Sequence, residues 1–378
     1  MRIAIDYTPA INQGAGIGRY TRCLVEALAE VDTENEYVLF YTYAGHKKPS
    51  WPFADQPNFV EKAASVSDRT LSVLWFRLGL PLPINLLIGD AALYHATDFV
   101  LPPLRRTAGI VTVHDLSFIL FPDHAESGLV SYLERAVPAS VERARLVLAD
   151  SENTRNDIVC LLDAEPGKVE VLYAGVERRF TVIDDEERLA GFRGHHNLVA
   201  PFILSVGTIE RRKNLARLIR AYGLLRSRNR VDHKLVIAGK PGWLYADVFE
   251  AVSDLHLEED VIFLGYVPDE DLPALYNLAD LFVYPSLYEG FGLPPLEAMA
   301  CGTPVVASDN SSLPEVLGDA YLSAAPTDTE ALGHAIERGL ADADLRRRLH
   351  ERGIERAARF SWEASARRLL DLYRQMGG

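Results

Sequence analysis

The sequence predicts an α/β protein built from two doubly wound domains with a cleft between them. Short runs of β-branched and aromatic residues alternate with helical patterns, which is the alternation that parallel sheets require. The alternation starts again in the second half of the chain, after a polar stretch at residues 175–188. With 378 residues, 48% of them apolar, the chain is long enough for two hydrophobic cores.

The first half contains the elements of one such domain. Its strand-like runs lie at residues 2–7, 37–43, 92–97, 109–115, 145–150 and 168–173. Helical patterns lie between them, at residues 17–30, 128–143 and 153–162. Because parallel strands need crossover connections, this order predicts a doubly wound domain over residues 1–180.

The second half repeats this organisation. Its strand-like runs lie at residues 202–207, 234–239, 261–265, 281–286, 304–308 and 320–324, with helical patterns near 214–227, 270–279 and 327–339. We therefore predict a second domain over residues 195–360, joined to the first near 177–195. The remaining residues, 361–378, contain an amphipathic helix at 362–376 that is able to pack across either domain.

Charge and cysteine content exclude several classes of protein. The formal net charge is −14, from 53 acidic against 39 basic residues, which argues against a nucleic-acid binder. The three cysteines, Cys23, Cys160 and Cys301, are scattered beside apolar neighbours, so we expect buried free thiols instead of disulfides or a metal site. The N-terminus lacks the regions of a signal peptide, so a cytoplasmic location is expected.

The most apolar stretch lies at residues 71–89. Arg77, two prolines and two glycines interrupt it, so it is not expected to span a membrane. A core helix with a loop is one interpretation. The other is an apolar surface that faces a membrane or an acceptor, and it requires Trp75, Phe76 and Leu78 to be exposed.

The segment YEGFGLPPLEAMACGTPVVAS at residues 288–308 holds two glutamates, Glu289 and Glu297, around glycines and prolines. The prolines suit the first turn of a helix and Gly302 suits its end, so a strand, a loop, a short helix and a strand are predicted here. Both glutamates would then lie at the carboxyl edge of a parallel sheet. Open α/β sheets bind ligands at that edge, and a helix N-terminus there favours an anion such as a pyrophosphate.

Two other loops follow predicted strands and open helices. The glycine-rich turn NQGAGIGRY at residues 12–20 is typical of phosphate or sugar contact, or of simple turn geometry, but it does not spell a dinucleotide fingerprint. The loop SVGTIERRKN at 205–214 carries Arg211, Arg212 and Lys213. Such a basic loop either neutralises a diphosphate or forms a solvated charge run.

Together these motifs resemble the retaining, nucleotide-sugar-dependent glycosyltransferases of family 4, which have the GT-B fold of two Rossmann-like domains. The glutamates match the E-x7-E element of that family, and LPEVLGDAYL at residues 313–322 matches its continuation. The basic loop resembles the family's phosphate-binding loop, and the glycine turn resembles the loop that closes over the diphosphate and acceptor. TVHD at 112–115 resembles the strand end whose histidine approaches the donor sugar.

The resemblance implies roles for individual residues. Glu289 would contact the hydroxyls of the transferred sugar, Glu297 the ribose, and Lys213 with Arg212 the diphosphate. His114 would approach the donor sugar, although a strand-end histidine with satisfied hydrogen bonds is the structural alternative. The other residues implied in donor binding belong to the same loops: Gly16, Gly207, Thr208, Gly290, Phe291, Gly292 and Leu293. Many relatives have arginine where this chain has Thr208, so one of the two usual phosphate cations is either missing or supplied by Arg212.

The expected chemistry needs no metal. Cations and helix N-termini stabilise the negative charge that develops on a departing diphosphate. The D-x-D strings at 269–271 and 342–344 precede helical patterns, where acidic residues are ordinary, and no metal site is expected there. A retaining glycosidase would need two carboxylates close together at the sugar, whereas Glu297 is assigned to the ribose.

The sequence therefore predicts a metal-independent, retaining glycosyltransferase with no cofactor besides its nucleotide-sugar donor. Its opening, IDYTPAINQGAGIGRYT at residues 5–21, resembles bacterial mannosyltransferases of O-antigen and exopolysaccharide synthesis. GDP-mannose is the expected donor and UDP-glucose the alternative, with a glycan or lipid-linked acceptor and a peripheral contact with the inner face of the membrane. A GT-B-fold sugar-nucleotide epimerase and a non-catalytic nucleotide-sugar-binding module are the other candidates. The sequence indicates no oligomeric state.

Overall fold

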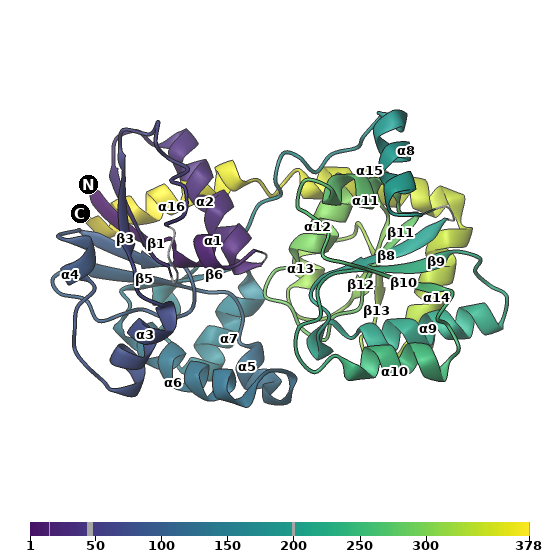
Figure 1. Cartoon of the computed structure of the whole chain (residues 1–378), viewed down its shortest axis with the longest axis horizontal. Coiled ribbons are helices and arrows are strands. Elements are labelled where there is room, and N and C mark those ends of the chain that lie inside the picture. The colour runs from purple at the N-terminus through teal and green to yellow at the C-terminus, as the bar shows by residue number, and fades with distance from the viewer. Residues whose placement is uncertain (15, 44–47, 199–200, 378) are drawn as a thin grey trace. The chain divides into compact units, whose positions relative to one another are not determined.

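The computed structural model describes residues 1–14, 16–43, 48–198 and 201–377. The chain divides into two compact units, each with its own parallel sheet (Figure 1). The first unit comprises Met1–Leu120, Gly128–Gly175 and Ser361–Gly378, and the second comprises Phe121–Ser127 and Val176–Phe360. The last residues of the chain thus belong to the first unit.

The sheet of the first unit has seven strands, and every neighbouring pair is parallel. In spatial order the strands are β3 (Phe59–Ala64), β2 (Glu36–Thr42), β1 (Arg2–Asp6), β4 (Leu93–Ala96), β5 (Ala108–Val113), β6 (Leu146–Ala149) and β7 (Val169–Val171). The order reverses between β1 and β4, which is the switch point of a doubly wound sheet.

Helices surround this sheet on both faces (Figure 1). They are α1 (Thr8–Asn12), α2 (Ile17–Val31), α3 (Asp68–Ser72), α4 (Asn85–Ile88), α5 (Ser117–Leu120), α6 (Ser127–Arg143), α7 (Glu152–Leu162) and α16 (Trp362–Gly377), with shorter turns η1 (Val73–Arg77), η2 (Pro122–His124) and η3 (Pro166–Lys168). The long helices α2, α6 and α7 confirm the predicted helical patterns within two residues.

The sheet of the second unit has six parallel strands. In spatial order they are β10 (Val261–Gly265), β9 (Lys234–Ala238), β8 (Phe202–Val206), β11 (Leu281–Tyr284), β12 (Val305–Ser308) and β13 (Leu322–Ala324). The helices are α8 (Glu186–His195), η4 (Arg211–Lys213), α9 (Leu215–Ser227), α10 (Ala246–Asp254), α11 (Leu272–Leu278), α12 (Leu293–Ala300), α13 (Leu313–Leu317), α14 (Thr329–Ala341) and α15 (Ala343–Ala357). Two doubly wound parallel sheets confirm the predicted fold class.

The C-terminal helix α16 packs against α2 within the first unit. Its Tyr373 hydroxyl lies 2.8 Å from Nδ1 of the buried His95 on β4, and the Trp362 ring packs edge-on against Tyr20 of α2. A Cβ atom on Gly175 would lie 2.1 Å from the backbone nitrogen of Trp362, so glycine is required where the two segments meet. Side-chain burial along α16 thus ties the end of the chain to the first core.

The sequence-based expectations gave no ranges for helices α8, α10 and α15, missed the edge strand β3, and misplaced one cysteine. Strand β3 was not predicted, because its residues FVEKAA carry charges and pair on one side only, at the edge of the sheet. Cys160 was expected to be buried but is exposed on α7, while Cys23 and Cys301 are buried, and all three are free thiols. Apolar neighbours in sequence do not face the same side of a helix, which explains the error at Cys160.

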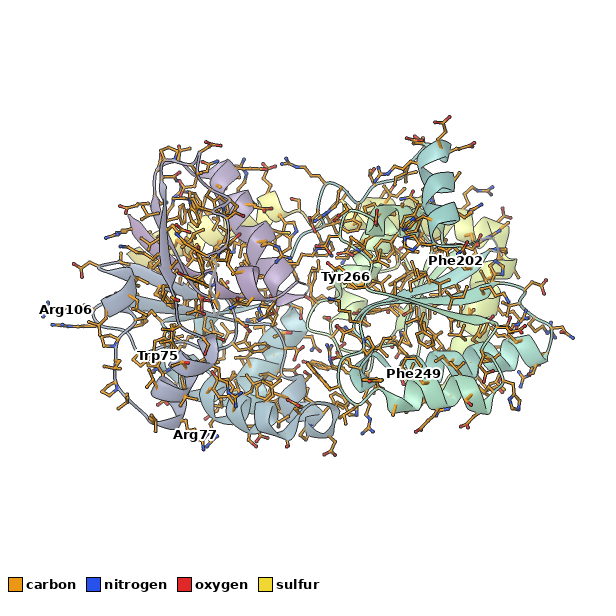
Figure 2. The ribbon with its side chains drawn as sticks, viewed as in Figure 1. Trp75, Arg77, Arg106, Phe202, Phe249 and Tyr266 are labelled. Atoms are coloured by element: carbon orange, nitrogen blue, oxygen red, sulfur yellow. The ribbon has the colours of Figure 1, made fainter. Side chains whose placement is uncertain are left out.

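The apolar stretch at residues 71–89 contains only short helical turns. Trp75 and Phe76 are half-buried, whereas Leu78 is 61% exposed and Arg77 points away from the ribbon (Figure 2). Of the three side chains that an apolar surface requires, only Leu78 is thus exposed. Among the described residues, no helix is both long enough and apolar enough to cross a membrane.

Two glycine loops meet at the carboxyl edge of the second sheet. Gly207 ends β8 and Gly239 ends β9, with φ of 150° and 156°, and a Cβ atom on Gly239 would lie 1.9 Å from the Gly207 carbonyl oxygen. The nearby amide of Gly242 donates to the carbonyl of Ile209 at 2.9 Å. This close approach positions the basic loop that follows β8.

Substitution of Gly239 with alanine should therefore destabilise the second unit. We expect Gly239→Ala to lower its free energy of unfolding by about 2 kcal/mol, because one of the two loops must move to admit the added carbon. Urea denaturation followed by circular dichroism measures the change. As a control, Gly191→Ala on the exposed face of α8, where no atom of the described residues lies within 4 Å of the added carbon, should be neutral or stabilising. Equal stability of the two variants would contradict the prediction.

Candidate active site

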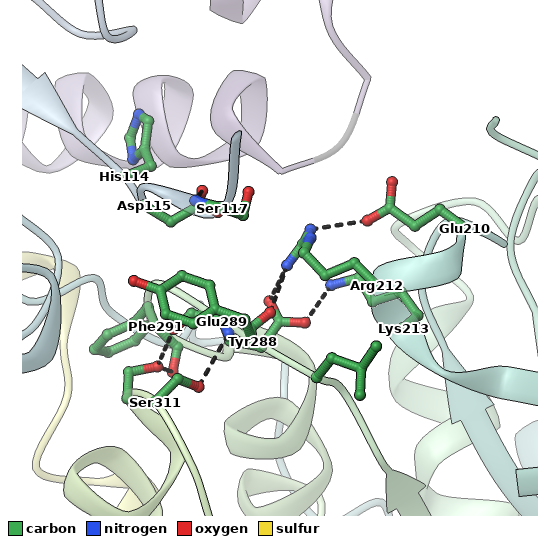
Figure 3. Close-up of polar contacts among 12 residues, drawn as sticks. His114, Asp115, Ser117, Glu210, Arg212, Lys213, Tyr288, Glu289, Phe291 and Ser311 are labelled. Atoms are coloured by element: carbon green, nitrogen blue, oxygen red, sulfur yellow. Dashed lines mark hydrogen bonds and ion pairs between the residues drawn. The ribbon is translucent and has the colours of Figure 1, made fainter. Parts of the chain in front are cut away.

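Three predicted catalytic side chains meet at the switch point of the second sheet. Arg212 and Lys213 lie in η4 after β8, and Glu289 lies in the loop between β11 and α12. Lys213 Nζ is 2.7 Å from Glu289 Oε1, and Arg212 Nη1 is 3.0 Å from Glu289 Oε2 (Figure 3). One carboxylate therefore bridges two cations that come from another loop.

Two further side chains complete this cluster. Lys213 Nζ also donates a hydrogen bond to the Tyr284 hydroxyl at 2.7 Å, and Arg212 Nη2 pairs with Glu210 Oε1 at 2.8 Å. Burial by itself would raise the pKa of Glu289, but the charges of Arg212 and Lys213 hold it at about 2. Glu289 is consequently ionised at neutral pH.

The loop that carries Glu289 is held by a second loop, at residues 310–312. The Glu289 amide donates to Ser311 Oγ at 3.0 Å, and the Ser312 hydroxyl lies 2.9 Å from the carbonyl oxygens of both Glu289 and Phe291. Ser311 has a φ of 51°, an uncommon conformation for serine. These contacts fix the backbone of Glu289 and leave its side chain as the part that is able to rotate.

The second glutamate of the pair occupies a different environment. Glu297 lies on α12, is 1% exposed, and accepts a hydrogen bond from the Tyr276 hydroxyl at 3.0 Å. Gly292 precedes α12 with a φ of 104°, and the helix begins at Leu293 with prolines in its first turn, as predicted. Gly290 is buried and Phe291 packs edge-on against Phe360. The roles of these residues in donor binding stay predictions.

Gly207, in the basic loop, has no side chain and therefore leaves space beside Lys213. Among the described residues, only the Lys213 side chain lies near the missing Cβ of Gly207, at 3.7 Å, and the neighbouring Thr208 is exposed. In the part of the chain that the structure describes, no group of three or more histidine, cysteine, aspartate or glutamate side chains is able to hold a metal ion. Asp342 of one D-x-D string caps helix α15 by accepting from the Leu345 amide at 2.9 Å.

His114 lies in the first unit, directly after β5. Its Nδ1 is 2.8 Å from Asp150 Oδ2, and its Nε2 is 2.9 Å from the carbonyl oxygen of Thr97. Since a carboxylate and a carbonyl both accept, both ring nitrogens carry protons in this arrangement. Burial by itself lowers the pKa of His114, but the charge of Asp150 and the hydrogen bonds outweigh it and raise the pKa to about 9.

The glycine turn of the first unit is braced by polar side chains. Gly16 has a φ of 56° and precedes α2, while the neighbouring Ala15 lies outside the described residues. Gln13 Nε2 donates to Asp98 Oδ2 at 2.9 Å, and Arg22 Nη1 donates to the carbonyl oxygens of Ala10 and Gln13 at 2.9 and 3.0 Å. The turn is thus connected to the end of β4.

The structure brings together Arg212, Lys213 and Glu289, and it places Glu297 in a separate buried contact. Sequence reasoning missed Glu210, Tyr284, Ser312 and Asp150. Asp150 was recognisable in principle, because it ends a predicted strand and the carboxyl ends of neighbouring parallel strands meet at one edge. Ser312 carried no such signal, since its contacts span more than 20 residues of sequence.

Replacement of Asp150 with asparagine should lower the pKa of His114. The carboxylate is the main partner that favours the imidazolium, so we expect Asp150→Asn to lower this pKa by about 2 units. Because the folded-state pKa lies above the ordinary value of 6.5, His114 stabilises the wild type fully below pH 6.5, and this contribution is lost as the pH rises through about 9.

An NMR titration of the His114 ring, with thermal unfolding at several pH values, measures both effects. Asp163→Asn, on an exposed acid at the end of α7, removes the same charge and serves as the control. A His114 pKa that is equal in the Asp150→Asn variant and the wild type would refute this account.

Comparison with known proteins identifies the family of this chain. Residues 192–356 match the family model described as "Glycosyl transferases group 1". The chain is 34% identical to O-antigen chain mannosyltransferase B of Escherichia coli, over 99% of this chain and all of that protein. It is 27% identical to O-antigen chain mannosyltransferase RfbU of Salmonella typhimurium, over 86% of this chain and 87% of that protein.

Solved structures share the fold along the whole chain. A sucrose-phosphate synthase from Thermosynechococcus elongatus superposes with a TM-score of 0.77 at 25% identity, covering 100% of this chain and 99% of that one. A glycosyltransferase from Rickettsia africae gives 0.72 at 16% identity, covering 99% of this chain and 98% of that one. The predicted GT-B fold is confirmed, and this chain belongs to the glycosyl transferase group 1 family, whose members use nucleotide-sugar donors.

Proposed function

We propose that this chain is a retaining mannosyltransferase that moves mannose from GDP-mannose to a glycan or lipid-linked acceptor in polysaccharide biosynthesis. Support for the sugar comes from the full-length similarity to an O-antigen chain mannosyltransferase. The single observation that carries the reaction type is the pairing of Arg212 and Lys213 with Glu289 at a ligand-binding sheet edge.

The chemistry of these side chains suits departure of a diphosphate. Cleavage of a glycosyl phosphate bond leaves negative charge on the leaving group, and Arg212 and Lys213 are preorganised cations that stabilise such charge. We infer that they do this without a metal ion. Gly207 and Thr208 would border the diphosphate, because Gly207 lies beside the Lys213 side chain and Thr208 follows Gly207 in the same loop.

The remaining predicted roles divide between the two units. In the second unit, Glu289 would contact the sugar hydroxyls and Glu297 the ribose, with the loop from Gly290 to Leu293 lining the donor. In the first unit, the loop of Gly16 would close over the diphosphate and acceptor, and His114 would approach the donor sugar. Because Asp150 keeps His114 protonated, the histidine would act there as a fixed positive charge and not as a base.

We also propose that the first unit contacts the anionic inner face of the membrane, through exposed leucines and not through Trp75 and Phe76, which are half-buried. Leucines are exposed over residues 78–87: Leu78 at 61%, Leu80 at 39%, Leu82 at 45%, Leu86 at 72% and Leu87 at 40%. Arg105 and Arg106 are exposed beside them, since the Arg105 amide donates to Asn85 Oδ1 of α4 at 2.9 Å, and Arg106 extends outward in Figure 2. Apolar side chains flanked by arginines suit a peripheral contact with anionic lipid.

A transfer assay with lipid-linked acceptor tests the enzymatic proposal. We expect transfer from GDP-mannose by the wild type, unchanged by EDTA, and a rate at least ~10²-fold lower for Lys213→Ala, the scale for loss of one preorganised stabiliser. Arg220→Ala, on an exposed cation of α9, is the matched control and should keep the wild-type rate.

Four outcomes would contradict the proposal. Transfer from UDP-glucose alone would refute the choice of donor. Strong inhibition by EDTA, reversed by magnesium or manganese, would refute the metal-free mechanism. Conversion of the donor to its C2 epimer without transfer would indicate an epimerase, and donor binding without any turnover would indicate a non-catalytic module.

Vesicle co-sedimentation tests the membrane contact. We expect binding to vesicles with anionic lipid at low salt, weaker binding at high salt, and a loss of about 30-fold for a variant with both Arg105→Gln and Arg106→Gln, at about 1 kcal/mol for each basic residue. A variant with Leu86→Ser and Leu87→Ser should also bind more weakly. The control, Leu161→Ser, changes a leucine of α7 that is 41% exposed. Wild-type protein that stays in solution at low salt would refute the contact.

A further inference from the structure

Charges around Glu289 balance within the second unit. Arg212 and Lys213 contribute two positive charges, and Glu289 and Glu210 contribute two negative charges, on side chains that are at most 19% exposed. Both oxygens of the Glu289 carboxylate are engaged by these cations, at 2.7 and 3.0 Å. The two cations assigned to a diphosphate therefore already hold an anion.

A carboxylate that bridges an ammonium and a guanidinium group makes the contacts that a phosphate makes with the same groups. We propose that Glu289 is the internal counter-ion of Arg212 and Lys213 before a donor binds, and that an incoming diphosphate displaces its carboxylate from these two cations. This inference rests on the proposed function, because it requires a nucleoside diphosphate sugar as the donor. It adds a role for Glu289 before the sugar contact.

Glu210 and Glu289 differ in how easily each is able to move away from the cations. Glu210 lies two residues from Arg212 in the same loop, so it stays beside the guanidinium. Glu289 comes from another loop, whose backbone is fixed by Ser311 and Ser312. Rotation of its side chain is thus enough to free the carboxylate while the loop stays in place.

Displacement of the Glu289 carboxylate makes binding of the diphosphate depend on the sugar of the same donor. A diphosphate without a sugar must remove the carboxylate from two cations, and the diphosphate itself offers the freed oxygens no hydrogen-bond donor. A diphosphate with a sugar brings hydroxyl groups that donate hydrogen bonds to the same oxygens. The sugar therefore contributes more to affinity in the wild type than in a variant that lacks this carboxylate.

Calorimetric titration of the full chain with pyrophosphate, GDP, GDP-mannose and guanosine tests the inference. Pyrophosphate reports on the two cations whatever base the donor carries, and guanosine carries no phosphate. We expect Glu289→Gln to bind pyrophosphate and GDP at least about tenfold more tightly than the wild type, because a neutral amide competes less for the cations. Guanosine should bind both proteins equally, and GDP-mannose should show a smaller gain than GDP.

Glu258→Gln is the matched control, since it removes the same charge from an exposed position of the second unit. Its affinities should stay within about twofold of the wild type, because exposed charges are screened. The Glu289→Gln variant leaves two buried cations with less compensating negative charge, which is able to destabilise the fold. Circular dichroism of the variant and the wild type therefore checks that both are folded.

A crystal structure of the wild type with GDP provides a test that needs no variant. We expect the distance from Lys213 Nζ to Glu289 Oε1, now 2.7 Å, to exceed 4 Å in the complex. Retention of both Glu289 contacts beside a bound diphosphate would overturn the inference.

Equal affinities of Glu289→Gln and the wild type for pyrophosphate would also overturn it, while the proposed transfer from GDP-mannose would stand. If the wild type binds neither GDP nor pyrophosphate, the proposed donor class fails and the inference fails with it. The two failures are thus distinguished by whether the wild type binds a diphosphate at all.

Discussion

The buried pairing of Glu289 with Arg212 and Lys213 is the interaction on which the second unit's site depends. Charges removed from water are costly unless each has a partner at close range, and here a carboxylate at 2.7 and 3.0 Å compensates two cations. The pairing also joins loops that follow different strands, so the loop after β8 and the loop after β11 keep one mutual arrangement. Without Glu289, the positive charges of Arg212 and Lys213 would repel each other. The carboxylate keeps the two cations side by side, an arrangement that suits an anionic ligand.

Backbone geometry makes this pairing available. The strand order of the second sheet reverses between β8 and β11, and open α/β sheets generally bind ligands at the carboxyl ends of such strands. Gly207 and Gly239 allow the two neighbouring loops to approach closely, and Ser312 fixes the backbone of Glu289 from the other side. The site is therefore supported by regular elements, with rotation of a side chain as its main freedom.

The carboxyl edge of the first sheet has a different electrostatic character. Asp6, Asp98 and Asp150 lie there, and burial raises the pKa of Asp6 to about 7. Carboxyl groups and the Gln13 amide suit hydroxyl-rich neutral molecules, whereas the cations of the second unit suit a diphosphate. This contrast agrees with assignment of the acceptor to the first unit and of the nucleotide to the second.

Local patterns in the sequence determined the succession of strands and helices, the short helix after the first glutamate and the basic loop after β8. Hydrophobic period, proline and glycine are properties of neighbouring residues, so they are readable without a structure. Contacts between distant residues are not. The pairing of Lys213 with Glu289 spans 76 residues, and that of His114 with Asp150 spans 36. Strand order and twist decide which ends of strands become neighbours, so only the tertiary structure revealed that Glu289 occupies the two cations, that His114 has both nitrogens engaged, and that the leucines near residue 86 face outward.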